Sequence, residues 1–213
     1  MNYPVLLSQM LQASLMSLRI FGSTLLFSLP LALLVAAGRR SKVRLVQIPV
    51  RIYILLMRGT PLMLQLLFLF YGLKPLTGIQ LDRVVAAQVA FVLNYAAYFA
   101  EIFRGGLDAL PRGQYEAAAV LGFSRRQTFF RIVLPQVCKM VLPPMGNEFI
   151  NLVKDTSLAQ VIGVTELLRV TSDWVSSAVS MTPFAVAAVF YLAMNAVVTR
   201  CFSAAEKRLG YYR

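Results

Sequence analysis

Residues 116–135 read EAAAVLGFSRRQTFFRIVLP, a polar and basic stretch that lies between strongly apolar segments. Gly122 is the residue type best suited to the left-handed turn that ends a helix. Ser124 and Gln127 have the S-x-x-Q spacing of a capping box, which begins a second helix. Pro135 is expected to limit the continuation of that second helix. The stretch therefore predicts two short helices joined by a rigid turn, an arrangement typical of a docking surface.

The composition of the chain is that of a membrane protein. Of its 213 residues, 58% are hydrophobic and only 14% are charged, whereas a soluble domain carries about 25% charged residues. The formal net charge is +12, but the basic residues lie between apolar segments rather than on one soluble face, which argues against nucleic-acid binding. His is absent, and Cys138 and Cys201 are far apart beside apolar stretches. We therefore expect the cysteines to be small apolar packing residues, with no metal site.

Apolar runs without a charge recur along the chain. The run from Ile20 to Gly38 has 19 residues, and a helix needs about 20 apolar residues to cross the hydrocarbon core of a bilayer. The fourth apolar region is interrupted by Lys154 and Asp155, and such a break is tolerated only where it faces protein or a water-filled cavity. We expect an all-α integral membrane protein that forms one transmembrane domain over residues 1–213. Its five transmembrane helices are predicted at about 14–38, 52–73, 84–103, 140–165 (interrupted) and 177–200, with a loop at 104–139.

Basic residues are distributed unevenly among the segments that join these spans. Three segments hold 16 of the 21 Lys and Arg residues: 39–58, 101–139 and 200–213. The alternate segments hold none, two and one: 1–18, 74–83 and 166–173. Because basic loops stay in the cytoplasm, we expect the N-terminus outside the cell and the C-terminus and the 104–139 loop in the cytoplasm. The residues interpreted as topology determinants, which can also contact anionic lipid, are Arg39, Arg40, Lys42 and Arg44.

The sequence carries no recognisable set of catalytic residues. It has no His to act as a general base and no G-x-x-x-x-G-K-[ST] phosphate loop, so the chain cannot hydrolyse ATP by that device. Glu148 and Asp155 are seven residues apart and can share a helix face. Lys154 stands next to Asp155, however, and is expected to neutralise it. We therefore expect this chain not to be an enzyme.

Seven residues within 116–135 follow the pattern E-A-A, three residues, Gly, nine residues, Ile-x-Leu-Pro: Glu116, Ala117, Ala118, Gly122, Ile132, Leu134 and Pro135. This spacing resembles the cytoplasmic loop signature of ABC-importer permease subunits. Three more segments resemble the branch of that family that imports polar amino acids: RGTPLMLQLLFLFYGL from Arg58, NYAAYFAEIFRGGL from Asn94 and NLVKDTSLAQVIGVTELL from Asn151. The four motifs occur in the right order, and the resemblance runs from about residue 14 to the end.

The resemblance implies a type I ABC importer permease in the bacterial inner (plasma) membrane. The implied partners are two ATP-binding subunits that hold ATP and Mg, a second copy or a homologous permease, an extracytoplasmic substrate-binding protein and membrane lipid. The implied substrate is an amino acid, and this chain itself is expected to bind no cofactor. The 104–139 loop would then be a coupling helix that rests on the ATPase. The residues expected to take part are Glu116, Ala117, Ala118, Gly122, Arg125, Arg126, Leu134 and Pro135.

Polar residues within the spans are candidates for a substrate path, because charged groups inside a bilayer cost several kcal/mol and tend to be functional or paired. Asp155 is expected to accept the ammonium group of a zwitterionic ligand. Asn94, Thr156 and Lys154 are the expected donors to the carboxylate of that ligand. An equally weighted alternative is that these groups pair between helices or across a permease dimer. The full candidate set is Asn94, Tyr95, Tyr98, Glu101, Glu148, Asn151, Lys154, Asp155 and Thr156.

Several alternatives stay open at this point. Pro61 can kink the second span and expose backbone groups to a cavity. Arg58 is interpreted as a cytoplasmic anchor in preference to a site residue, and Trp174 is expected at the outer membrane interface. An ion-coupled secondary transporter and a membrane scaffold without transport are the rival functions, although the spans show no internal repeat of the kind secondary transporters usually have. The sequence does not identify the amino acid, nor whether the permease pairs with itself.

Overall fold

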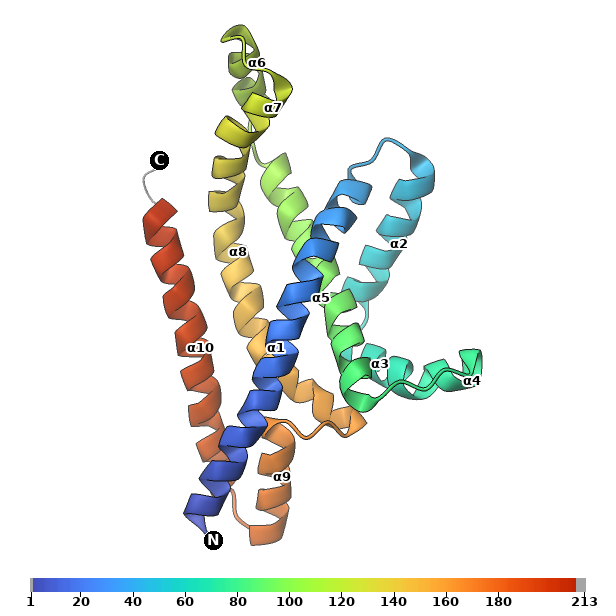
Figure 1. Cartoon of the computed structure of the whole chain (residues 1–213), viewed down its shortest axis with the longest axis vertical. Coiled ribbons are helices and arrows are strands. Elements are labelled where there is room, and N and C mark those ends of the chain that lie inside the picture. Colours follow the sequence, from blue (N-terminus) through green and yellow to red (C-terminus); the bar gives the residue numbers. More distant parts are fainter. Residues whose placement is uncertain (1, 210–213) are drawn as a thin grey trace.

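Long helices run side by side along one axis of the molecule. The computed structural model describes residues 2–209, and every regular element in that range is helical. The long helices are α1 (Tyr3–Arg39), α5 (Arg83–Asp108), α8 (Leu134–Asp155) and α10 (Thr182–Leu209) (Figure 1). The shorter ones are α2 (Arg44–Gly59), α3 (Leu62–Leu67), α4 (Leu73–Thr77), α6 (Arg112–Val120), α7 (Arg125–Thr128) and α9 (Leu167–Ala178). The predicted all-α class is confirmed.

Three described helices, α1, α5 and α10, are long and apolar enough to cross a membrane. Together, α2 and the segment Leu62–Thr77 make a fourth candidate if this pair, bent by 108°, is counted as one span. Helix α1 has 37 residues, so it is about 55 Å long at 1.5 Å per residue. It begins well before the predicted start near residue 14. The count of five spans and their orientation remain predictions.

Helices α1 and α5 form the centre of the bundle. Ala86, Ala90 and Ala97 of α5 are almost completely buried and belong to one apolar cluster with Ile20 and Ala32 of α1. Small side chains let two helix backbones approach closely, which is how helices associate within lipid. Another side of α5 carries Asn94 and Tyr95, whose hydrogen bonds reach α2, α3 and α8.

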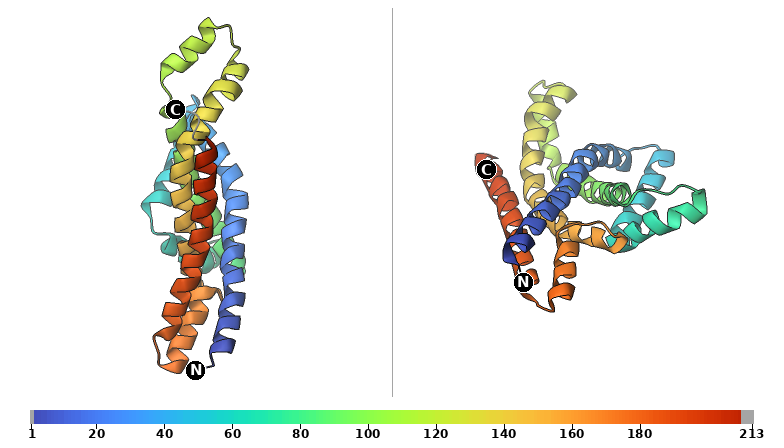
Figure 2. Two further views of the ribbon diagram at one scale, coloured as in Figure 1. Left: turned by 90° about the vertical axis from the view of Figure 1, so that its left-hand side faces the viewer. Right: turned by 60° about the horizontal axis from the view of Figure 1, so that its bottom comes forward.

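The second span, predicted at 52–73, is broken at Thr60 and Pro61, in agreement with the expectation that Pro61 can break or kink it. Thr60 and Pro61 are extended, so α2 ends at Gly59 and α3 leaves the bundle sideways (Figures 1 and 2). Proline disfavours the helical conformation of the residue before it and cannot donate a backbone hydrogen bond. The side-chain amide of Gln65 compensates, donating to the carbonyl oxygen of Met57 at 3.0 Å and to the Thr60 hydroxyl at 2.9 Å. A π-helical turn, Phe68–Gly72, then joins α3 to α4.

The predicted interruption of the fourth apolar region is present in the structure. Helix α8 ends at Asp155, a 3-10 helix follows over Thr156–Ile162, and Gly163 adopts a φ of 81° before α9. The buried carboxylate of Glu166 begins α9 by accepting hydrogen bonds from the backbone N–H groups of Leu168 and Arg169 at 2.8 and 2.7 Å. The chain therefore turns twice between α8 and α9 and folds α9 back against α1 and α10.

The predicted fifth span, 177–200, starts too early. Val179 has a φ of 48°, which ends α9 at Ala178, and α10 begins only at Thr182. Residues 174–199 contain no charged side chain, and this apolar run is divided between α9 and α10. The indole N–H of Trp174 donates to the side-chain oxygen of Gln9 at 2.7 Å, which fixes α9 to the first turns of α1.

Candidate functional site

The loop that joins α5 to α8 projects from one end of the bundle (Figures 1 and 2). Its turn is a Schellman motif, in which Gly122 N–H donates to the Ala119 carbonyl and Phe123 N–H donates to the Ala118 carbonyl, both at 3.0 Å. Gly122 has a φ of 76°, a conformation that residues with a Cβ atom rarely adopt. The predicted left-handed turn at Gly122 is confirmed.

The second helix of this loop begins with the predicted capping box. The Gln127 backbone N–H donates to the Ser124 hydroxyl at 3.3 Å, and the Ser124 backbone N–H donates to the Gln127 side-chain oxygen at 2.9 Å. Both contacts are made within four residues of sequence. The angle between α6 and α7 is therefore set by the loop's own residues.

The prediction that Pro135 limits the second helix is wrong. A π-helical turn, Phe129–Val133, follows α7 and leads directly into α8, which begins at Leu134. In this wider turn the Leu134 N–H donates to the carbonyl of Phe129, five residues earlier. The π-helical turn moves the preceding carbonyls away from the proline ring and so removes the clash that breaks an ordinary α-helix. As a result, α7, the π-helical turn and α8 form one continuous helical segment.

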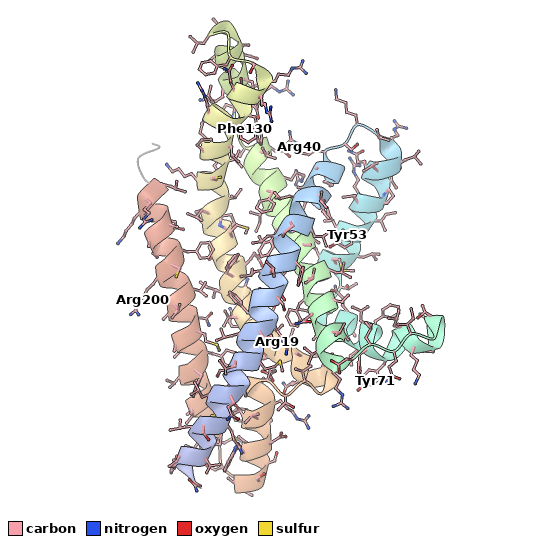
Figure 3. All side chains as sticks on the ribbon, viewed as in Figure 1. Arg19, Arg40, Tyr53, Tyr71, Phe130 and Arg200 are labelled. Atoms are coloured by element: carbon pink, nitrogen blue, oxygen red, sulfur yellow. The ribbon has the colours of Figure 1, made fainter. Side chains whose placement is uncertain are left out.

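Most residues predicted to couple to an ATPase lie on the surface of this loop. Ala118 is buried (1% exposed), but Val120 and Leu121 are 88% and 73% exposed. Phe130 lies at the base of the loop and is also exposed (Figure 3). The predicted residues that are exposed are Glu116, Ala117, Gly122, Arg125, Arg126 and Leu134, whereas Pro135 is half-buried. The surface of the loop therefore combines exposed apolar side chains with two arginines.

A polar cavity of about 370 Å³ lies where α2 and α8 both break. It is built from three segments that are far apart in sequence, and its lining consists of Thr60, Pro61, Leu62, Asn94, Tyr95, Tyr98, Glu148, Asn151, Asp155 and Leu158. Six of the nine predicted path residues line it: Asn94, Tyr95, Tyr98, Glu148, Asn151 and Asp155. The other three, Glu101, Lys154 and Thr156, do not.

Hydrogen bonds hold the cavity side chains in place. The Tyr95 hydroxyl donates to one carboxylate oxygen of Asp155 at 2.8 Å, joining α5 to the end of α8. The Asn94 amide donates to the Met57 carbonyl at 2.9 Å and to the side-chain oxygen of Gln65 at 3.0 Å. Asn94 thus uses its amide N–H groups to stabilise the broken second span. Its amide N–H groups are therefore not free to donate to a ligand, although the sequence analysis expected them to do so.

Lys154 and Asp155 do not form the direct contact that the predicted neutralisation suggested. No ion pair joins Lys154 and Asp155 among residues 2–209, and Lys154 is exposed outside the cavity. Thr156 is buried, and its hydroxyl donates to the Val153 carbonyl at 2.8 Å. Adjacent residues on a helix point in different directions, so Lys154 faces away while Asp155 faces the cavity. Neither Lys154 nor Thr156 is placed to donate to a ligand carboxylate there.

Glu101 belongs to a separate cluster of charges at the end of α5. Arg104 donates to both of its carboxylate oxygens, at 2.7–3.1 Å. Arg39 of α1 and Arg58 of α2 approach Glu101 to 3.7 and 3.8 Å, and the Arg58 guanidinium lies 5.2 Å from the centre of the Tyr98 ring. Sequence reasoning missed this cluster because α1, α2 and α5 contribute to it from distant positions.

A second cavity, of about 540 Å³, adjoins this charge cluster. Its lining includes Arg39, Arg51, Arg58, Tyr98 and Glu101. Tyr98 therefore borders both cavities, with an acidic one on one side and an arginine-lined one on the other. Among residues 2–209, no group of three or more His, Cys, Asp or Glu side chains is arranged to hold a metal ion.

Residues 28–211 match the family described as the binding-protein-dependent transport system inner membrane component. The chain belongs to this family. It is 44% identical over 144 residues to the L-cystine transport system permease protein TcyB of Bacillus subtilis (strain 168), a match that covers 68% of this chain and 61% of that protein. It is also 37% identical over 193 residues to the octopine transport system permease protein OccM of Rhizobium radiobacter, covering 84% and 79%.

A solved structure of an amino acid ABC transporter with histidines superimposes on this inner membrane component with a TM-score of 0.87. That match has 30% sequence identity and covers 94% of both chains. The family resemblance carried by the four sequence motifs is therefore confirmed, and so is the type I importer permease fold. Membership in this family makes the chain a transport component of the inner membrane rather than an enzyme.

Proposed function

We propose that this chain is the permease of an ATP-driven importer of amino acids, with the 370 Å³ cavity as part of its translocation path. The observation that carries the proposal is the cavity itself, which has two carboxylates and no basic side chain in its lining. It lies at the breaks in two helices of a transport-family member. Broken helices at membrane depth are tolerated where they line a cavity, and transporters bind substrates at such breaks.

The chemistry of the cavity suits an amino acid. Asp155 uses one carboxylate oxygen for Tyr95 and has a second available to accept from an ammonium group. Glu148 and the amide of Asn151 lie in the same lining. Two relatives are named for the transport of L-cystine and of octopine. Both compounds are amino acids or amino acid derivatives that carry a protonated amine, so they are the first substrates to test.

The loop of α6 and α7 is the proposed contact with separate ATP-binding subunits. Its exposed apolar side chains, Val120 and Leu121, need a protein partner in the cytoplasm, and Arg125 and Arg126 can pair with acidic groups beside it. Its turn is rigid, and it continues into α8, which ends at Asp155 in the cavity. A movement of the ATPase would thus reach the substrate path through one helix.

The proposed assembly contains two ATP-binding subunits that hold ATP and Mg, two permease chains and an extracytoplasmic substrate-binding protein. The proposed topology has five spans with the N-terminus outside and the C-terminus in the cytoplasm. It places the α6–α7 loop beside the ATPase. Fusing a periplasmic and a cytoplasmic reporter at each end of the chain tests this orientation directly.

The function is tested by reconstituting the permease with its ATP-binding subunits and binding protein in liposomes. We expect uptake of an L-amino acid that requires internal ATP, together with ATPase activity that the loaded binding protein stimulates. Uptake driven by a proton or sodium gradient without ATP would show a secondary transporter instead. Assembly with the ATPase but no uptake of any L-amino acid would show a different substrate or a scaffold, and would contradict the proposal.

A further inference from the structure

The acidic cavity lacks a cationic partner for the carboxylate of an amino acid. Its lining offers two carboxylates for an ammonium group but no Lys or Arg for the carboxylate. The donors expected from the sequence, on Asn94, Lys154 and Thr156, are committed elsewhere or lie outside the cavity. A zwitterion bound there would have its carboxylate desolvated beside two carboxylates and without a counter-charge, which is costly.

Arg58 is the arginine placed at the border of this cavity. Its guanidinium lies over the ring of Tyr98, and Tyr98 lines both the acidic cavity and the arginine-lined one. In the chain it comes directly before Gly59 and Thr60, where α2 ends and the acidic cavity begins. A planar guanidinium held on an aromatic face keeps its N–H donors in a fixed fork, which matches a carboxylate.

The hydrogen-bonding capacity of Arg58 is unused within residues 2–209. Its nearest acid is Glu101, at 3.8 Å, beyond hydrogen-bond distance. Both oxygens of Glu101 are already taken by Arg104. The Arg58 side chain is 44% exposed, so a ligand can reach it. A surplus cation beside an acidic cavity is the arrangement that a zwitterion needs.

We propose that Arg58 binds the α-carboxylate of the substrate, whose ammonium group faces Asp155 and Glu148. This inference rests on the proposed function and narrows its substrate class to zwitterionic amino acids that keep a free carboxylate. It also gives Tyr98 a role, since its ring holds the guanidinium at the border of the two cavities. Arg58, which the sequence analysis interpreted as a cytoplasmic anchor, is then a residue that determines substrate specificity.

The test compares each amino acid with its decarboxylated counterpart on the purified permease–ATPase complex in lipid nanodiscs. The binding protein is left out, so that its own selectivity does not enter. The pairs are L-arginine with agmatine, L-glutamine with 4-aminobutanamide and L-cystine with cystamine, and the pair used is the one whose amino acid the wild-type complex imports in liposomes. Arg58→Gln should weaken binding of the amino acid about tenfold or more and leave the affinity for the amine unchanged.

Two further variants make the result specific. Arg58→Lys keeps the charge but loses the planar fork, so it should retain part of the affinity for the amino acid. Arg51→Gln removes the same charge from the same arginine-lined cavity, seven residues earlier on α2, and should leave both affinities near the wild-type values. An equal loss for amine and amino acid in Arg58→Gln, or an equal effect of Arg51→Gln, would overturn the role of Arg58. Where the wild-type complex imports a different L-amino acid, that amino acid and its decarboxylated amine form the pair. If it imports no L-amino acid at all, the proposed function fails, and the Arg58 role fails with it.

Discussion

The α6–α7 loop and the polar cavity are built in opposite ways. The loop makes its decisive hydrogen bonds between residues that are three to five apart, around Gly122 and between Ser124 and Gln127. The cavity is assembled by contacts between residues that are 29 to 60 apart, such as Asn94 with Gln65 and Tyr95 with Asp155. Backbone conformation therefore determines the shape of the loop, while tertiary packing positions the chemical groups of the cavity.

This difference predicts two kinds of sensitivity. The cavity should respond to changes in charge and hydrogen bonding that leave the backbone alone. The loop should tolerate many changes of side chain but respond to those that alter its turn. Helix α8 joins the two regions, since it begins at the loop and ends at Asp155. Changes in either region therefore affect the same reconstituted complex, in which uptake and ATPase activity can both be measured.

The largest effect is expected from Asp155→Asn, which removes a charge from the cavity with almost no change in shape. A hydrogen bond to a charged group contributes about 1.5–3 kcal/mol, so uptake efficiency should fall about 10- to 100-fold. The measurement is kcat/KM for uptake of the amino acid into liposomes, with the amount of assembled complex checked by co-purification. Asp173→Asn, on exposed α9 and outside the cavity, is the matched control. Wild-type kinetics for Asp155→Asn would assign Asp155 a purely structural role.

A smaller but clear effect is expected from Gly122→Val in the loop. Nothing lies within 4 Å of a Cβ atom added at Gly122, so the only obstacle is its φ of 76°. A β-branched residue in that conformation costs roughly 1–3 kcal/mol, enough to shift the turn and reduce substrate-stimulated ATPase activity about tenfold. Membrane insertion should be unaffected.

Two controls separate the turn from the loss of a glycine. Asn tolerates the left-handed conformation, so Gly122→Asn should keep most of the activity. Gly113 also has open space around it but lacks the positive φ, and Gly113→Val should couple nearly normally. Full coupling in Gly122→Val, with normal subunit assembly, would show that the turn is not the mechanical link.

These contrasts also explain what could be read from the sequence. Gly122, Ser124 and Gln127 act on their immediate neighbours, so their spacing predicted the turn and the capping box that the structure contains. The prediction that Pro135 limits the helix was wrong because the π-helical turn over Phe129–Val133 depends on the backbone of several residues. The presence of one proline in the sequence does not indicate such a turn. The all-α class followed from the long apolar runs, while the breaks near Pro61 and Asp155 followed from residues that disturb a helix locally.

The cavity was only partly predictable for the same physical reason. Asn94, Tyr95 and Asp155 stood out as polar residues in apolar segments, but their partners lie in other helices. Nothing in the sequence indicates that Asn94 stabilises the break after Gly59 or that Arg58 rests on Tyr98. Charges at positions 39, 58 and 101 meet only after α1, α2 and α5 have packed together.

Tyr95→Phe tests the cavity with a single atom. The change removes the hydroxyl that donates to Asp155 and leaves the ring in the apolar core. Asp155 then loses the contact that orients it, and we expect the KM for uptake to rise roughly three- to tenfold. Tyr71→Phe is the control, because Tyr71 is exposed outside the cavity and its hydroxyl makes no hydrogen bond within residues 2–209. Similar KM values for the two variants would contradict the role of Tyr95 in positioning Asp155.

The smallest effect is expected from Ser124→Ala, which removes one cap from α7. Loss of a capping side chain costs about 1 kcal/mol. Here, however, the Schellman turn at Gly122 and the continuous connection of α7 to α8 still hold the loop in place. Substrate-stimulated ATPase activity should fall less than about threefold, and Ser124→Asp, which keeps a capping oxygen, should restore it. A loss as large as that of Gly122→Val would mean that the cap and the turn act as one unit, so that the loop, like the cavity, depends on cooperation among its contacts.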